Sequence, residues 1–486
     1  MNTIPLFVII PLSAAFLTAL LSIKSRRAGE WIAVAGPLAL LVLALGLVPV
    51  ALRKGLVTVP MGNWMPPKGI AAVADGLTVF MLVTVNLVSF LVMVYATRYM
   101  RRYTDTGKFY SLYMLMLAGM NGVIISGDLF NLYVFLEIGS VAGYALVAFG
   151  IEPEDLEASF RYTVMGTLAS IFILLGIALL YGYTSTLQIT DIAGVLAARP
   201  RGALVGLVSV LFLAGFGVKS ALVPFHSWLP DAHSSAPAPV SATLSGVFIK
   251  TIGIYACARL FFTMLGPSAR INGVLIALGI LSMCVGALLA CAQDDIKRMC
   301  AYSSISQIGY IFCAFGIGTP LAVMAGLFHL FNHAIFKSLL FLNAGAIEYA
   351  AHTRSLRRMG GLNAALPTAG FTSLIGSLSI AGVPPFGGFW SKLLIIIAAL
   401  QAGHTGVGVV AVLVSILTLA YYVRFQTHAF FGSRNVAAGE IAKVPFAMNF
   451  SMIALAVISC AAGLLLTPAA KPLLQSAAAA LGGTLR

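Results

Sequence analysis

Seven titratable side chains lie inside otherwise apolar stretches and are of the types that pass protons from one to the next. They are Glu137, Lys219, Lys250, His329, His333, Lys337 and Lys392. An ionised group at the centre of a bilayer is costly and needs a compensating partner, so each of them is a candidate for function by default. The chemistry they could perform together is proton translocation.

Glu137 and Lys219 are the first two candidates along the chain. Glu137 lies near the middle of NLYVFLEIGSVAGYALVAF, which places it near mid-membrane. A structural ion pair between two helices is the alternative interpretation. Lys219 lies in VLFLAGFGVKSALVPFHSW, where the following Pro224 should break the helix. A break at membrane depth is tolerated only inside protein or beside a hydrated cavity, so the lysine and the break support each other.

Four candidates follow on the next stretches. Lys250, in LSGVFIKTIGIYA, is a buried cation that could exchange a proton, because burial disfavours its charged form. Snorkelling to an interface is the alternative. In HLFNHAIFKSLLFL, His329, His333 and Lys337 recur every four residues and so share one helix face, as a proton relay requires. Structural histidines or a metal site are the alternatives, but no third ligand is evident and no metal is predicted.

Lys392 repeats the arrangement seen around Lys219. It lies in SIAGVPPFGGFWSKLLII, directly after Pro384 and Pro385, which must interrupt helical hydrogen bonding. Two proline-interrupted apolar segments, each with one buried lysine, are typical of transporters built from structural repeats. The five helices between them indicate that the repeats are inverted.

Two polar stretches could take up protons at a membrane surface. PFHSWLPDAHSSAPAPVSA is too polar for hydrocarbon, so we expect His226, Asp231 and His233 at an interface or in a polar cavity, in a proton-uptake site or a plain loop. The chain's one acidic run predicts a helix start, with partner docking or proton collection as the second interpretation. The run consists of Glu152, Glu154, Asp155 and Glu157.

The elements that must position these residues are membrane-spanning helices. The chain has 486 residues, of which 60% are hydrophobic and 9% charged. Runs of about 20 apolar residues span a bilayer. Such runs predict an all-α polytopic membrane protein with about 14 helices near residues 2–23, 30–50, 74–97, 109–126, 128–149, 159–182, 203–224, 240–262, 271–292, 298–317, 321–347, 366–402 (interrupted), 407–430 and 447–467.

The net charge of +14 has no polybasic run that would indicate nucleic-acid binding. The loops after odd-numbered helices are the richer in Lys and Arg, which predicts that both termini face away from the cytoplasm. Their cations include Lys24, Arg26, Arg27, Lys297 and Arg298. The first run precedes basic residues instead of following them, so it is predicted to be a retained span. We expect the cytoplasmic (inner) membrane of a prokaryote.

The six cysteines lie in or beside apolar helices without a Cys-x-x-Cys spacing, and no phosphate-binding glycine loop is present. No cofactor is therefore predicted. We expect an ion-translocating subunit that is not catalytic by itself. If electrons or nucleotides are involved, partner chains handle them.

Five phrases in fixed order carry a resemblance to a known family: GDLFNLYVFLE, PFHSWLPDAH with APAPVSA, DDIKRMCAYSSISQIGYI, FNHAIFKSLLFL and GVPPFGGFWSK. Over roughly residues 70 to 430 the chain resembles the antiporter-like subunits of respiratory complex I. It most nearly resembles the D-type component of Mrp cation/proton antiporters and its relatives in membrane-bound hydrogenases. A lysine at position 392 departs from family members with glutamate there, which favours the Mrp D type and certain complex I subunits.

This resemblance implies a fourteen-helix core with two inverted five-helix repeats, helices 4–8 and 9–13, in which helices 7 and 12 are broken. The corresponding divisions are 1–108, 109–265, 266–432 and 433–486. It also implies that Glu137 and Lys219 form a coupled pair in one half-channel and that Lys392 opens the other. Lys250, His329, His333 and Lys337 would connect them.

The implied partners are small membrane subunits of an antiporter, hydrogenase or complex I-type assembly. Protons are the implied substrate, with sodium exchange left open. A proton-pumping subunit of a complex I-type NADH:quinone oxidoreductase is the alternative function. A free-standing transporter of an organic solute, which needs a pocket at the midplane, and a scaffold whose buried charges only pin helices are the other hypotheses.

Overall fold

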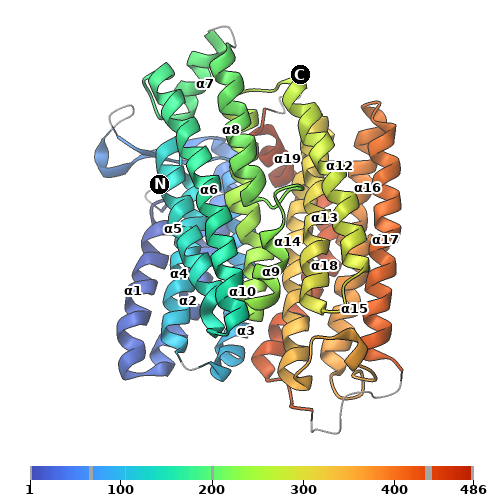
Figure 1. The fold of residues 1–486 in the computed structure, drawn as a ribbon. Helices are drawn as coiled ribbons and strands as arrows, with labels where there is room; N and C mark the ends of the chain where they lie inside the picture. Colours follow the sequence, from blue (N-terminus) through green and yellow to red (C-terminus); the bar gives the residue numbers. More distant parts are fainter. Residues whose placement is uncertain (1–2, 65–68, 104, 199–201, 433–440, 483–486) are drawn as a thin grey trace.

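Long helices that run side by side make up the computed structural model, which describes residues 3–64, 69–103, 105–198, 202–432 and 441–482 (Figure 1). Twelve helices in these residues are long and apolar enough to cross a membrane. The structure therefore confirms the prediction of a helical, polytopic membrane protein. The predicted division at residue 433 falls on residues 433–440, which lie outside the described part.

The first half of the chain contains the candidate residues Glu137, Lys219 and Lys250. Its helices are α1 (Leu6–Lys24), α2 (Arg26–Lys54), α3 (Gly76–Tyr99), α4 (Thr106–Ile125), α5 (Leu129–Val147), α6 (Pro153–Thr184), α7 (Ile189–Ala198), α8 (Ala203–Lys219), α9 (Trp228–Ser235) and α10 (Ala238–Thr243). The chain continues from α10 through the π-helical segments η4 (Leu244–Phe248) and η5 (Lys250–Tyr255), α11 (Ala256–Ala258) and η6 (Arg259–Met264).

The helices of the second half contain the other candidates. They are α12 (Ala269–Cys291), α13 (Ile296–Ile317), α14 (Pro320–Ala351), α15 (Pro367–Ala381), α16 (Gly387–Gln401), α17 (Thr405–Phe430), α18 (Phe446–Ala461) and α19 (Lys471–Ala479). The short helices α7 and α19 were not predicted from the sequence. Nor was the two-stranded antiparallel sheet of β1 (Val57–Pro60) and β2 (Ala71–Ala74), in which Val57 pairs with Ala74.

Aspartate side chains start three of the long helices. Asp75, Asp128 and Asp295 each accept a hydrogen bond from a backbone N–H in the first turn of α3, α5 and α13 at 2.8–2.9 Å. The first N–H groups of a helix have no partner within it, and a carboxylate satisfies them and complements the helix dipole. The short polar connections therefore set where each apolar helix begins.

Two helical stretches are broken where the sequence places prolines. α8 ends at Lys219, and the chain resumes a helix only at Trp228. α15 ends at Ala381 before Pro384 and Pro385, and α16 begins at Gly387. The second break is tight, because a Cβ on Gly388 would lie 1.8 Å from the Ser379 carbonyl oxygen. Only glycine permits this approach of the two helix ends.

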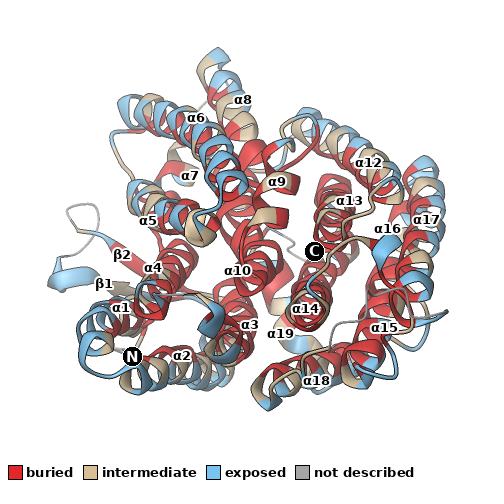
Figure 2. Cartoon of the chain, turned by 60° about the horizontal axis from the view of Figure 1, so that its bottom comes forward, coloured by how far each residue is buried: buried red, intermediate tan, exposed pale blue. Residues whose placement is uncertain are grey.

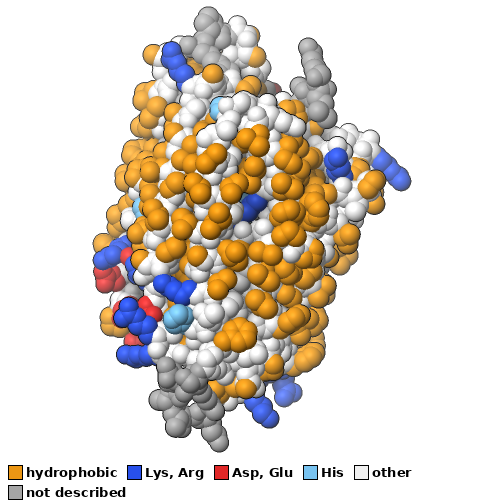
Figure 3. Space-filling view, turned by 90° about the vertical axis from the view of Figure 1, so that its right-hand side faces the viewer, with side chains coloured by type: hydrophobic (Ala, Val, Ile, Leu, Met, Phe, Trp, Pro, Cys, Tyr) orange, Lys and Arg blue, Asp and Glu red, His pale blue; other side chains and the backbone are white. Residues whose placement is uncertain are grey.

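Burial is concentrated along the centre of the bundle. Viewed from the end, buried residues fill α3, α10, α13 and α14, whereas α1, α6, α12 and α17 present exposed residues outward (Figure 2). On the side face in Figure 3, hydrophobic side chains cover the middle, and charged ones gather mainly toward the two ends. This distribution suits a protein surrounded by lipid, in which the polar chemistry lies inside.

A buried ion pair that was not predicted from the sequence joins the start of α3 to the start of η6. Arg259 donates to both carboxylate oxygens of Asp75 at 2.6 Å, and the two side chains are only 9% and 14% exposed. Burial opposes ionisation of Asp75, but the facing guanidinium holds the pKa of this carboxyl below its usual value. The pair ties the start of η6 to the start of α3.

Arg259→Met should destabilise the protein by about 3–5 kcal/mol, because removing one partner of a buried pair leaves the other charge uncompensated. Thermal unfolding of the purified protein in detergent measures this loss. The double variant Arg259→Met/Asp75→Asn should recover part of it. Equal stability of Arg259→Met and the wild type would contradict the structural role.

Candidate proton-translocation site

Glu137 on α5 and Lys219 at the end of α8 form an ion pair inside the bundle. Lys219 Nζ lies 3.6 Å from Glu137 Oε1. Lys219 is 2% exposed, whereas the side chain of Glu137 is 29% exposed. The two residues that the sequence analysis proposed as a pair are thus neighbours, beside the first helix break.

Three hydroxyl groups complete the surroundings of this pair. Lys219 Nζ donates to Ser140 Oγ at 3.0 Å and to Tyr144 OH at 3.4 Å. Ser170 on α6 donates to the Glu137 carboxylate. Ser140 and Tyr144 follow Glu137 by three and seven residues on the same helix face, a spacing that could have revealed them. Ser170 comes from another helix and left no local signal.

Lys250 is fully buried in the π-helical region. Its Nζ donates to the Ser245 carbonyl, and the Ser245 hydroxyl lies 2.7 Å from the Ser304 hydroxyl of α13. The i→i+5 pattern of a π-helix leaves neighbouring backbone carbonyls available to side chains. Lys250 therefore has a polar neighbour at this depth although no carboxylate contacts it among the described residues. Lys250 therefore does not extend to a membrane surface, which was the alternative interpretation.

Lys337 on α14 is also fully buried and has two oxygen partners. Its Nζ donates to the Cys300 carbonyl at 2.7 Å and to Tyr422 OH at 3.2 Å. Tyr422 OH lies in turn 3.3 Å from Ser303 Oγ. Both partners are neutral oxygens, so no carboxylate pairs with Lys337 among the described residues.

His329 and His333 precede Lys337 on the continuous helix α14 and are fully buried. His329 Nδ1 lies 2.9 Å from Ser391 Oγ on α16, one residue before Lys392. The two imidazole centroids lie 6.4 Å apart. Among the described residues neither nitrogen of His333 has a hydrogen-bond partner. The histidines thus lie between Lys337 and the second helix break.

Lys392 lies in the second turn of α16, just after that break. It is 3% exposed, and its Nζ lies 4.8 Å from the centroid of the Tyr310 ring. Within the described part of the chain, its Nζ has no hydrogen-bond partner. Among those side chains, the structure brings Glu137 into contact with Lys219 and His329 close to the helix of Lys392. It joins Lys250, His333 and Lys337 to one another by no hydrogen bond.

The polar stretch after the first break does not form a single exposed loop. Asp231 lies on α9, partly exposed, and binds Arg161 at 2.9 Å and Arg298 at 2.7 Å. His226 is half-buried. His233, expected at an interface or in a polar cavity, is instead fully buried beside aromatic rings, because α9 turns that face of the stretch into the bundle. That expectation is correct for Asp231 and wrong for His233.

The position of Lys297 also differs from the prediction. The charge pattern placed it in a basic loop, but it lies in the first turn of α13 and is 1% exposed. The acidic run does mark a helix start, because α6 begins at Pro153 with Glu154 and Asp155 in its first turn. Asp155 lies largely buried there, whereas Glu152, Glu154 and Glu157 are exposed.

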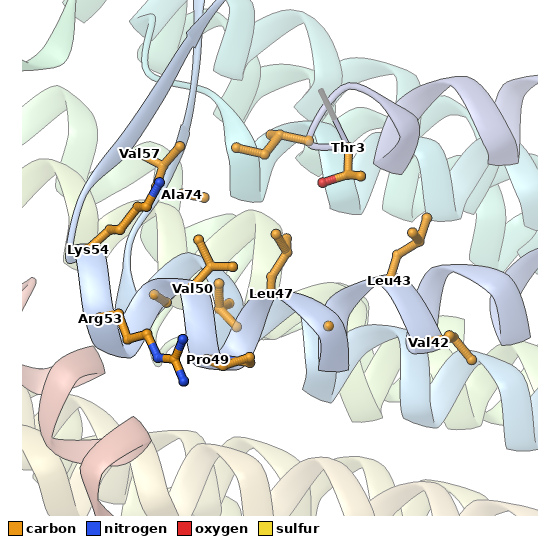
Figure 4. A pocket seen from close by; sticks show the side chains of 14 residues that line it. Thr3, Val42, Leu43, Leu47, Pro49, Val50, Arg53, Lys54, Val57 and Ala74 are labelled. Atoms are coloured by element: carbon orange, nitrogen blue, oxygen red, sulfur yellow. The ribbon is translucent and has the colours of Figure 1, made fainter. Parts of the chain in front are cut away.

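A cavity of about 440 Å³ opens elsewhere, between the start of α1 and the end of α2 (Figure 4). Its walls are mainly apolar, including Leu43, Leu47 and Val50, and no candidate residue lines it. It therefore offers no support for a solute pocket at the buried charges. In the described part of the chain, no group of three His, Cys, Asp or Glu side chains could hold a metal ion.

Comparison with protein families gives two matches in the chain. Residues 126–418 match the sequence model of the transmembrane region described as NADH:quinone oxidoreductase/Mrp antiporter. Residues 64–110 match the model described as the N-terminus of chain 5 of NADH-ubiquinone oxidoreductase (complex I). The first match covers every candidate residue named above.

Relatives and solved structures point the same way. The chain is 38% identical over 438 residues to the N subunit of the NADH-quinone oxidoreductase of Desulforudis audaxviator, covering 87% of this chain and 86% of the relative. It is 34% identical to the D subunit of the Na(+)/H(+) antiporter of Alkalihalophilus pseudofirmus, covering 79% and 78%. A chain of the Mrp complex from Dietzia sp. superimposes with a TM-score of 0.90 at 29% identity, covering 99% and 97%. An archaeal membrane-bound sulfane sulfur reductase contains a chain with the same TM-score and identity, covering 100% of each chain.

Proposed function

We propose that this chain, which belongs to the family of NADH:quinone oxidoreductase and Mrp antiporter transmembrane subunits, is the proton-translocating subunit of a cation/proton antiporter-type membrane complex. The observation that carries the proposal is the Glu137–Lys219 ion pair beside the break after α8. An acid and a base in contact stabilise each other's charged forms, so separating them lets the lysine release its proton inward.

The proton path runs from this pair toward Lys392. Lys250 receives the proton near the centre of the bundle, Lys337 and the histidines His333 and His329 pass it on, and Lys392 releases it at the second break. The Ser391 hydroxyl between His329 and Lys392 supports the last step, because it lies on the helix of the lysine and 2.9 Å from the imidazole.

The same reasoning extends to the architecture. In our proposal α8 with α9, and α15 with α16, are the broken seventh and twelfth of fourteen membrane-spanning helices. Helices 4–8 and 9–13 form two inverted repeats at residues 109–265 and 266–432, after an N-terminal part at 1–108 and before a C-terminal part at 433–486. The paired lysine-and-break arrangements at Lys219 and Lys392 support this division.

The partners in this proposal are other membrane subunits of a multisubunit complex in the inner membrane of a prokaryote. Both named structural neighbours are chains of larger complexes, which supports this choice of partners. The basic loops after odd-numbered helices face the cytoplasm, so both termini face outside. The exchanged cation is sodium, as in the name of the Alkalihalophilus relative.

A second candidate is a proton-pumping subunit of a complex I-type NADH:quinone oxidoreductase. The 38% identity to the Desulforudis protein favours it. The antiporter is preferred because several similar relatives have antiporter names and the Mrp chain matches over nearly its whole length. The two candidates share the proposed route and differ in what drives it.

Purification of the tagged chain from native membranes in mild detergent, with mass spectrometry of its partners, tests the parent complex. Small membrane antiporter subunits alone are expected. If flavin, iron–sulfur or nickel–iron subunits are found instead, the parent complex is a redox-driven pump and not an antiporter.

Lys250→Met should lower proton transport by the reconstituted complex at least about tenfold, because the route loses a group that can accept a proton. A pH-sensitive dye inside proteoliposomes reports the rate after a sodium gradient is imposed. Lys108→Met is the matched control, since the Lys108 side chain is 79% exposed and pairs with Asp105. Wild-type transport by Lys250→Met would remove this lysine from the route.

A further inference from the structure

A polar pocket opens at the end of the bundle where α6 begins. Its volume is about 390 Å³, and its walls come from α6, α9, α13 and the segment after α14. Asp231 lies between Arg161 and Arg298 in it, and Glu154, Glu157 and Asp295 add carboxylates. Water and exchangeable protons can therefore reach Ser234 and Ser235 of α9, which line the pocket.

His233 lies directly behind this wall. It is adjacent to Ser234 in the chain but is 0% exposed. Neither of its ring nitrogens has a hydrogen-bond partner among the described residues. Its ring packs against Trp228 at 6.4 Å and Phe341 at 5.6 Å between centroids. Buried polar groups are usually hydrogen-bonded, so an imidazole with both nitrogens free in this position calls for an explanation beyond packing.

Lys297, in the first turn of α13, contacts the backbone just after α9. It is 1% exposed, and its Nζ donates to the Ala236 carbonyl, three residues after His233. The acidic groups close enough to act on it electrostatically are Asp155, Asp295 and Glu348, and Arg354 opposes them. Lys297 is thus a buried cation with carboxylates nearby, one of which, Asp295, lines the pocket.

Three lysines lie near His233. Lys250 on η5, Lys337 on α14 and Lys297 on α13 are all close enough to act on it electrostatically. His233 is therefore near both the buried lysine next to α9 and two lysines of the proposed route. No carboxylate acts on it in this way within the described part.

We propose that protons enter the centre of this subunit from the polar pocket through Lys297 and His233, and that opening and closing of the Glu137–Lys219 pair determines when they move on toward Lys392. This inference rests on the proposed function and assigns its uptake side. The neutral imidazole accepts a proton from the Lys297 ammonium on one ring nitrogen and gives its other proton to a neutral Lys250 or Lys337. Lys297 then regains a proton from the pocket, so no electrons or further reactants are needed.

The first test compares His233→Leu and Lys297→Arg in the reconstituted native complex. Both should reduce proton transport at least about tenfold while the complex assembles normally. Arginine keeps the charge of Lys297 but does not release a proton, so a purely structural cation would tolerate it better than a relay. His404→Leu is the matched control, because His404 is exposed at the start of α17.

The outcome separates this inference from the proposed function. If Glu137→Gln loses transport while His233→Leu and Lys297→Arg keep wild-type rates, the uptake route is wrong and the proposed function stands. If all of these variants transport normally, both the uptake route and the proposed function are wrong. If the complex with His233→Leu does not assemble, transport by Lys297→Arg and the labelling experiment described next decide whether the uptake route is correct.

Sidedness provides that second measurement. Ser235→Cys places a thiol in the pocket wall, in a chain whose exposed Cys460 is replaced by serine. A membrane-impermeant thiol reagent added on the pocket side should slow transport severalfold, and the same reagent on the opposite side should not. Unchanged transport after complete labelling of the introduced thiol on the pocket side would overturn the proposal.

Discussion

Glu137→Gln should lower proton transport by the reconstituted complex at least about 100-fold while leaving assembly intact. Glutamine has nearly the shape of glutamate and can still accept the hydrogen bond from Ser170. It has no charge, so Lys219 loses the counter-ion that lies 3.6 Å away. Without the negative charge, the lysine no longer gains from being protonated when the pair closes, and closing and opening the pair no longer moves a proton.

The rate of pH change inside proteoliposomes measures this effect, and the yield of the purified complex measures assembly. Glu30→Gln is the matched control, since Glu30 is a paired carboxylate on α2 that contacts Arg101 at 3.1 Å outside the proposed route. It should transport at the wild-type rate.

A double variant separates transport from a scaffold role. If the pair only pins α5 to α8, removing both charges in Glu137→Gln/Lys219→Met should restore what either single change loses, because no unpaired charge remains. If the pair moves protons, the double variant assembles and stays inactive. Recovery of transport in the double variant would contradict the interpretation that the pair relays protons.

The sequence was informative about Glu137 and Lys219 because the features that mark these two residues are local in the chain. A charge within an apolar run and a proline close to it are visible without any knowledge of the fold, and both Lys219 and Lys392 lie where such signals predicted a break. The same holds for His329, His333 and Lys337, whose spacing matches the continuous helix α14.

What the sequence did not reveal depends on contacts between distant segments. Ser170 reaches Glu137 from 33 residues away, and Arg259 reaches Asp75 from 184 residues away. Lys297 was predicted in a loop because the next apolar run was placed from residue 298 and the basic residues before it were counted as loop cations. It is buried because α9 folds back over the start of α13, where its Nζ finds the Ala236 carbonyl. The π-helical turns around Lys250 also lack a propensity signature that the sequence analysis could use.

Lys392→Arg should be as inactive as Lys392→Met, with transport lowered at least about 100-fold in each. Lys392 Nζ lies 4.8 Å from the Tyr310 ring centroid, a contact that arginine makes at least as well as lysine. A structural role for this cation would therefore survive the change to arginine. A role that requires losing a proton would not, because the guanidinium stays charged throughout the accessible pH range.

The comparison depends on both variants folding around the tight break at Gly388, so assembly of the complex is measured beside the transport rate. Lys108→Arg, at a position where the side chain is 79% exposed, controls for the exchange itself. Transport by Lys392→Arg near the wild-type rate, with Lys392→Met inactive, would show that the charge and not the transferable proton matters at this break. The outward step would then have to belong to His329, which is the next titratable group inward and is linked to α16 through Ser391.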